Sequence, residues 1–226
     1  MNRTNMGIAS LALVLLMAVA AAAVAASIPG DVRLPIHWNI AGEPDNYAGK
    51  WVALLIPAAI AAGLSGFFYL LPRLEPRAKN FARSQGLYMW AWASILLLLV
   101  AVEAVTISVA FGWHWRVFHV LSAAIGAMFA MMGNQLGKSR SMYLVGIRTP
   151  WTLASEEVWI RTHRLGGKLM VAGGLLLIVL ALLPVPSGPF SAAFAAIIGL
   201  MVAVPVAYSY LLWRRERKDQ VSRDAT

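Results

Sequence analysis

The 226-residue chain contains no cysteine and few charged side chains, and both shortages narrow what the protein can be. Without cysteine it has neither disulfide bonds nor thiolate metal ligands. Charged residues make up 13% of the chain, against about 25% in an ordinary soluble domain, and hydrophobic residues make up 60%. Acidic residues are scarcer than basic ones, 10 against 19, so the formal net charge is +9. This composition predicts an integral membrane protein.

The apolar residues are gathered into six runs that can each cross a bilayer as an α-helix, some with help from flanking residues. The runs cover residues 6–28, 51–71, 86–111, 117–132, 168–183 and 190–212. The predicted fold class is all-α: a polytopic bundle of six transmembrane helices forming one membrane domain over residues 1–226. Within it we expect a two-span unit, 6–71, with an outer loop at 29–50. A four-span unit, 86–212, should follow, with an inner loop at 133–167.

Lysine and arginine are distributed unevenly between the two sides of this predicted bundle. Sixteen of the 19 lie at the N-terminus, in the second and fourth connections and in the tail, whereas Arg33, Lys50 and Arg116 lie in the others. The positive-inside rule therefore places both termini in the cytoplasm of a bacterial cell, with a multi-pass protein in its cytoplasmic membrane. Because the basic residues flank apolar runs, membrane lipids are the expected partners and direct nucleic acid binding is not expected.

The first apolar run allows two interpretations. Arg3, an apolar stretch and the small residues Ala25, Ala26 and Ser27 resemble a signal peptide with its cleavage site. The stretch is longer than the apolar region of most signal peptides, however, which favours a retained membrane span. Cleavage would leave five spans without changing the orientation of the others.

The inner loop, 133–167, is a long polar segment between two apolar runs, and Pro150 prevents a helix from running through it. Thr152 or Ser155 can cap a short helix that has acidic residues in its first turn. The apolar residues that follow lie roughly on one face, which predicts a short amphipathic helix in the inner interface. Gly166 and Gly167 should end this helix before the fifth span begins.

The outer loop is rich in turn-forming residues and carries a group of polar and aromatic side chains. These candidates for an outer-face site are His37, Trp38, Asn39, Glu43 and Asp45. The loop can be a solvated cap, or its polar side chains can form a binding pocket. His37 and Asp45 do not have the spacing of a recognised metal site.

Three more outer-face candidates lie in or near the third and fourth spans. Glu103 lies deep in a span, where a charge costs about 2.5–3.5 kcal/mol, so it is a candidate functional residue by default. Alternatively, it is a neutral acid that hydrogen-bonds to a neighbouring helix, for example to Ser108 or Thr106. His114 and His119 flank the outer turn and could line a pocket above Glu103, or they could lie among the lipid headgroups.

Two sets of motifs resemble the SdpI/YfhL family. The first is GIRTPWTL at 146–153, followed by SEEVW at 155–159 and THR at 162–164. The second is HWN at 37–39 with GEPD at 42–45, which resembles an N-terminal domain of unknown function common in that family. One difference is Met142, where relatives usually carry asparagine. The family consists of six-span immunity proteins against the sporulation-delaying peptide toxin.

The resemblance implies a role in resistance and a possible second role in signalling. It implies that a peptide toxin is recognised at the outer face, and that members can tether a cytoplasmic transcriptional repressor at the inner face. The inner-loop residues that it assigns to the family motif and to partner docking are Asn134, Gly146, Arg148, Thr149, Pro150, Trp151, Trp159, Thr162, His163 and Arg164. Of these, Arg148, Trp151 and Arg164 are the strongest candidates for docking.

Two other classes of function remain open. A small proton- or ion-coupled transporter could use Glu103 and the proline-containing second and sixth spans. A metal-dependent hydrolase could use His37, Glu43, His114 and His119, although no metal-binding motif of recognised spacing is present. We therefore expect no enzyme activity, cofactor, metal or catalytic residue, and leave the toxin and the oligomeric state open. Gly63 and Gly66, and also the pair at 173–174, are expected to mark close helix packing.

Overall fold

The computed structural model describes residues 2–39, 41–113 and 116–224. Its elements in chain order are α1 (Arg3–Ser27), β1 (Arg33–Trp38), β2 (Pro44–Gly49), α2 (Lys50–Leu74), α3 (Ala78–Arg83), α4 (Gln85–Ala110), α5 (Val117–Leu136), α6 (Pro150–Ala154), α7 (Glu156–Leu182) and α8 (Ser187–Asp224). Among the described residues, six helices are long and apolar enough to cross a membrane: α1, α2, α4, α5, α7 and α8. The structure therefore confirms the prediction of an all-α polytopic membrane protein. The division into units at 6–71 and 86–212 stays a prediction.

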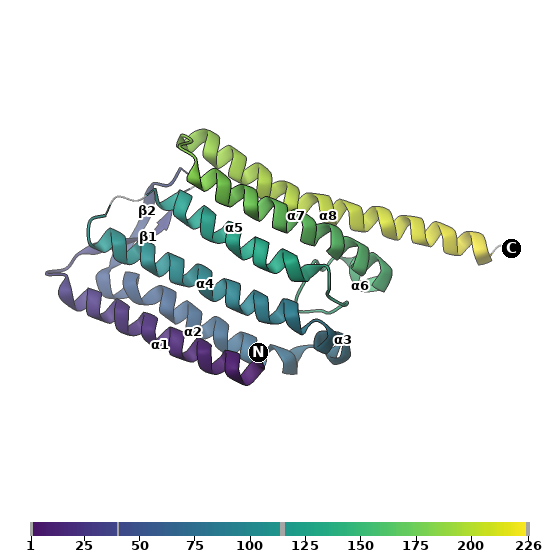
Figure 1. Ribbon diagram of the computed structural model, residues 1–226, viewed down its shortest axis with the longest axis horizontal. Coiled ribbons are helices and arrows are strands. Elements are labelled where there is room, and N and C mark those ends of the chain that lie inside the picture. The colour runs from purple at the N-terminus through teal and green to yellow at the C-terminus, as the bar shows by residue number, and fades with distance from the viewer. Residues whose placement is uncertain (1, 40, 114–115, 225–226) are drawn as a thin grey trace.

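The six long helices lie side by side along the long axis of the molecule, in the order α1, α2, α4, α5, α7 and α8 (Figure 1). We call one end the hairpin end, because β1 and β2 lie there, and the other the basic end, where α3 and α6 lie (Figure 1). The last turns of α8 project beyond the bundle at the basic end. Arg33, Lys50 and Arg116, the three cations predicted for the outer side, belong to the hairpin end.

Glycine permits the closest helix contact in the bundle, between α5 and α7. A Cβ atom added at Gly126 would lie 2.5 Å from the carbonyl oxygen of Gly174, and one at Gly133 would lie 2.7 Å from that of Gly167. Real Cβ atoms do not approach so closely, so only glycine fits at these positions. This confirms the prediction of close packing at 173–174. The same prediction for Gly63 and Gly66 is wrong, because nothing lies within 4 Å of a Cβ atom added at either.

The amphipathic interfacial helix predicted in the inner loop is not a separate helix. The structure does begin a helix where predicted: the Ser155 hydroxyl accepts a hydrogen bond from the Val158 amide, and Glu156 and Glu157 occupy the first turn. This helix, α7, then runs without a break through Gly166 and Gly167 into the fifth span. Both glycines are buried against neighbouring side chains and backbone, so they serve packing and do not end the helix.

The outer loop contains a two-stranded antiparallel sheet that the turn-rich sequence did not predict. β1 pairs with β2, and the register shifts near His37. Asn39 organises the turn, because its side-chain oxygen accepts hydrogen bonds from the amides of Ala41 (2.9 Å) and Glu43 (3.0 Å). Gly42 has a positive φ of 83° and lies against Phe118 at the start of α5. The hairpin is therefore seated on the helical bundle.

Candidate functional site

Side chains from three segments hold residues 137–149, which we call the motif loop, by hydrogen bonds. Its central contact is made by Glu75, a buried carboxylate just after α2. Its Oε2 atom accepts hydrogen bonds from the backbone amides of Tyr143 (3.0 Å) and Leu144 (2.8 Å). Its Oε1 atom accepts one from the backbone amide of Arg77 (3.0 Å). A single side chain thus satisfies amides from two segments far apart in the sequence.

Three further side chains from the same connection hold the motif loop. The Arg77 guanidinium donates to the Ser141 hydroxyl and to the Leu153 carbonyl (3.1 Å), and lies 4.6 Å above the Tyr143 ring. Asn80 donates to the Ser141 carbonyl at 2.8 Å. Ser84 accepts from the Arg140 amide at 2.8 Å. The segment 75–84 therefore acts as a template for the start of the motif loop.

Trp159 and His163 of α7 hold the other side of the motif loop. Their rings stack with centroids 3.8 Å apart, and both residues are fully buried. The Ile147 amide donates to Nε2 of His163 at 2.9 Å, so Nδ1 carries the proton and donates to the Trp159 carbonyl at 2.9 Å. Gly146 has a positive φ of 122°, and a Cβ atom there would lie 2.7 Å from the His163 ring. These contacts explain the Gly of the motif and give His163 a structural role.

The remaining motif residues form the short helix α6 and its contact with α8. Thr149 caps α6 through a reciprocal pair of hydrogen bonds with Thr152, and Pro150 occupies the first turn. The Thr149 hydroxyl also lies 3.2 Å from that of Ser209 in α8. Trp151 packs against Tyr210, with ring centroids 5.1 Å apart, and reaches towards Trp213. This aromatic group joins the motif to the helix that projects from the bundle.

The three docking candidates differ in their surroundings. Arg148 is exposed and donates to the Tyr143 carbonyl at 2.8 Å. Arg164 is exposed on α7 and lines a groove together with Asn134 of α5. Thr162, the remaining motif residue, is fully buried, and its hydroxyl has no hydrogen-bond partner in the described part of the chain.

At the hairpin end, the structure brings together the predicted polar residues of the outer loop. Nδ1 of His37 lies 2.5 Å from a carboxylate oxygen of Asp45, and both side chains are exposed. The side-chain amide of Asn39 donates to Glu43 at 3.2 Å. Trp38 is half-buried at the end of β1. The hairpin thus presents a small polar surface, stabilised by its own contacts.

Glu103 and His119 are buried within the bundle, and His114 lies outside the described residues. One carboxylate oxygen of Glu103 has no hydrogen-bond partner in the described structure. The hydroxyls of Thr106 and Ser108 donate instead to the carbonyls of Val102 and Val105, so the predicted bond to either is wrong. The His119 ring stacks on Phe190 of α8, with centroids 3.8 Å apart. Among the described residues, no group of three potential metal ligands is found.

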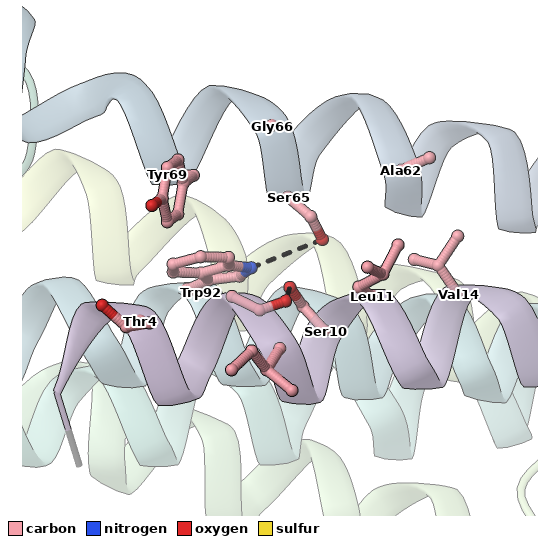
Figure 2. Close-up of a pocket in the computed structure, with 11 residues that line it drawn as sticks. Thr4, Ser10, Leu11, Val14, Ala62, Ser65, Gly66, Tyr69 and Trp92 are labelled. Carbon is pink, nitrogen blue, oxygen red and sulfur yellow. Dashed lines mark hydrogen bonds between the residues drawn. The ribbon is translucent and has the colours of Figure 1, made fainter.

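A separate cavity of about 380 Å³ lies between α1 and α2, near the basic end. Figure 2 shows the Trp92 ring of α4 on its inner side, with Nε1 donating to the Ser65 hydroxyl at 3.5 Å. Ser10 and Leu11 face it from α1 and Tyr69 from α2. The cavity is mostly apolar, so it suits a hydrocarbon chain or an apolar side chain.

Sequence reasoning missed Glu75, Asn80 and Ser84, and interpreted Arg77 only as an orientation signal. One signal was present: Glu75 is the only acidic residue between Pro72 and Ser84. An acid that follows a membrane span in a basic segment requires a partner, and here that partner is the backbone of the motif loop.

The bundle and its polar end define the class: a six-span α-helical membrane protein whose longest polar loop is folded against the helix ends. Comparison with known proteins shows which families parts of the chain resemble. The model described as the SdpI/YfhL protein family matches residues 138–209, and that of a domain of unknown function, DUF1648, matches residues 12–61. The two matches include the segments whose motifs resemble this family and its N-terminal domain, at 146–164 and 37–45.

One curated relative is the Immunity protein SdpI of Bacillus subtilis (strain 168). It is 22% identical to this chain over 149 residues, which is 66% of this chain and 69% of the relative. No solved structure matches the chain. The SdpI/YfhL match covers the motif loop from Lys138 onwards, together with α6, α7 and most of the span in α8.

Proposed function

We propose that this protein is a membrane immunity protein that protects its cell against a secreted antimicrobial peptide toxin. The observation that carries the proposal is the similarity to the Immunity protein SdpI, together with the match of the SdpI/YfhL family to the motif loop and the helices around it. The predicted orientation, with both termini in the cytoplasm, puts the hairpin end outside. The polar surface of the hairpin is then the first surface that a secreted toxin meets.

The toxin contact that we propose is built on His37 and Asp45. Their side chains are exposed and paired, so they can exchange this pair for contacts with a peptide without unfolding the hairpin. Glu43 and Asn39 extend the polar surface around the turn. Glu103 and His119 are buried and belong to the interior of the bundle, so they are not part of this outer surface.

A signalling role would use the opposite end of the protein. Arg148 is exposed three residues before Trp151 in the chain, and Trp151 packs against α8, whose basic C-terminal turns project from the bundle. Arginine supplies bidentate contacts and tryptophan supplies contact area, so this surface fits a cytoplasmic repressor that is held at the membrane. Toxin that binds at the hairpin end would have to alter this docking surface at the basic end, across the length of the bundle.

The first prediction separates the two ends by mutation. In a toxin-sensitive bacterial strain challenged with the sporulation-delaying peptide, the wild-type protein should restore survival. His37→Ala should lower the protective effect about tenfold, as expected for the loss of a binding contact worth about 1.4 kcal/mol. Arg148→Ala should leave survival unchanged and weaken only a repressor-dependent reporter.

Both substitutions are at exposed positions, so the abundance of the protein in the membrane should stay at the wild-type level. Asp31→Ala, another exposed residue at the hairpin end, is the matched control and should protect like the wild type. Failure of the wild-type protein to protect, at normal membrane abundance, would contradict immunity against this toxin.

Buried Glu103 supports a second candidate, a proton- or ion-coupled transporter. In the part of the chain that the structure describes, one carboxylate oxygen of Glu103 lies within a membrane span without a hydrogen-bond partner, which is expected of a proton or ion site. In proteoliposomes, a proton-dependent flux that is lost on Glu103→Gln would support transport. The same variant should fold, because glutamine preserves the shape of the side chain, and wild-type resistance in this variant would show that immunity does not require the charge.

A further inference from the structure

A groove of about 570 Å³ runs along α5 and α7 at the basic end, and the proposed functions leave it without a role. Three cationic side chains line its polar end: Lys138, just after α5, and Arg164 and Lys168 on α7. All three side chains are exposed, and none of them makes an ion pair with a residue in the described part of the chain. The groove therefore concentrates unneutralised positive charge at the end of two membrane spans.

The spacing of these residues directs their charges to one place. Arg164 and Lys168 are four residues apart on α7 and share one helix face. Gly137 brings the start of the motif loop against Arg164, since a Cβ atom there would lie 3.3 Å from its Cα atom. Lys138 follows directly, so all three cations border the same end of the groove.

The remainder of the groove is apolar and leads towards the middle of the bilayer. Gly133 and Gly167 have no side chains to fill it, and Ala172 and Leu175 continue its wall along α7. From Lys168 to Leu175 the helix rises about 10 Å, which matches the depth from the headgroups into the acyl chains. The groove is therefore amphiphilic, with its charged part at the membrane surface.

We infer that this groove is a binding site for an anionic phospholipid, with the phosphate held by Lys138, Arg164 and Lys168 and an acyl chain lying along Ala172 and Leu175. Basic pockets between transmembrane helices are suited to anionic headgroups. A free phosphate would use the cations but not the apolar wall, whereas a phospholipid uses both. Asn134, at the polar end, can donate a hydrogen bond to the headgroup.

The test is native mass spectrometry of the full-length protein, purified in detergent and titrated with phosphatidylglycerol or phosphatidylcholine. The groove variant replaces Lys138, Arg164 and Lys168 with glutamine. The control replaces Arg214, Arg215 and Lys218 of α8 with glutamine, which removes the same charge outside the groove. We expect the wild type and the control to bind phosphatidylglycerol at least about tenfold more tightly than the groove variant, since each cation near an anionic headgroup adds to the attraction.

Two further measurements separate the lipid from other anions. Ala172→Trp fills the apolar wall while it keeps all three cations, and it should weaken phosphatidylglycerol binding by a similar factor. Glycerol phosphate should not compete with the lipid at equal concentration. Equal losses in the groove variant and the control would overturn the site, and so would effective competition by glycerol phosphate.

The outcome does not depend on immunity, because lipid binding is measured on the purified protein without toxin. If circular dichroism shows that the groove variant has lost helix content, the two single variants Lys168→Gln and Ala172→Trp are measured in its place. Each should weaken the binding of phosphatidylglycerol. Lipid binding that is unaffected by either single change would also overturn the inference.

Discussion

Replacing Gly133 with leucine is expected to destabilise the protein strongly. A Cβ atom at this position would lie 2.7 Å from both the carbonyl oxygen of Gly167 and the Cβ atom of Met170, and 2.9 Å from the backbone nitrogen of Val171. Two of these neighbours are backbone atoms, so α5 and α7 must move apart. Overpacking of this kind costs about 3 kcal/mol, and the separation also forfeits the contacts of the whole helix pair.

The measurement is thermal unfolding of the purified protein in detergent, with membrane abundance as a second readout. Gly63→Leu in α2 is the matched control, because nothing lies within 4 Å of a Cβ atom there. We expect a large loss of melting temperature for Gly133→Leu and little change for the control. Equal behaviour of the two variants would show that α5 and α7 are not packed through this glycine.

The substitution Glu75→Ala should release the motif loop while the six spans stay inserted. It removes the acceptor of the backbone amides of Tyr143, Leu144 and Arg77 at a buried position. Each hydrogen bond to a charged group contributes about 1.5–3 kcal/mol, so the local structure loses at least about 3 kcal/mol. Hydrogen exchange at the Tyr143 and Leu144 amides should become faster by about two orders of magnitude.

Two comparisons make this second prediction specific. Glu75→Gln keeps one accepting oxygen and should show a smaller acceleration of exchange. Glu157→Ala, an exposed acid in the first turn of α7, should leave the motif loop protected. Unchanged protection in Glu75→Ala would contradict the role of this carboxylate. If the motif loop is required for immunity, the variant will also lose protection at normal membrane abundance.

The fold could be predicted from the sequence because the bilayer requires long apolar helices, and these are readable as runs of apolar residues. The end of the inner loop was predicted incorrectly for a physical reason. A glycine pair can end a helix or let two helices touch, and sequence alone does not distinguish these when the partner is a distant helix. At Gly167 the partner is the backbone of Gly133, and α7 continues.

The motif itself was readable, but the contacts that fix it were not. Gly146 and His163 were identified from their pattern, and the structure gives them a shared contact. Glu75 was not identified, because its hydrogen bonds reach backbone amides 68 and 69 residues away, and a backbone amide has no sequence signature. The β-hairpin was missed for a similar reason, since Pro44 and Gly49 suggest turns although both belong to a strand.

The position of Glu75 has a consequence for how the protein can be divided. It lies between the predicted two-span and four-span units, yet with Arg77, Asn80 and Ser84 it supplies the contacts of the motif loop. A fragment that starts at residue 86 would lack segment 75–84, which holds the motif loop. A chimera that exchanges residues 86–226 between relatives would combine the motif loop with another protein's version of that segment. The boundary for recombination therefore falls before Glu75, within the second helix, and not in the connection between the two predicted units.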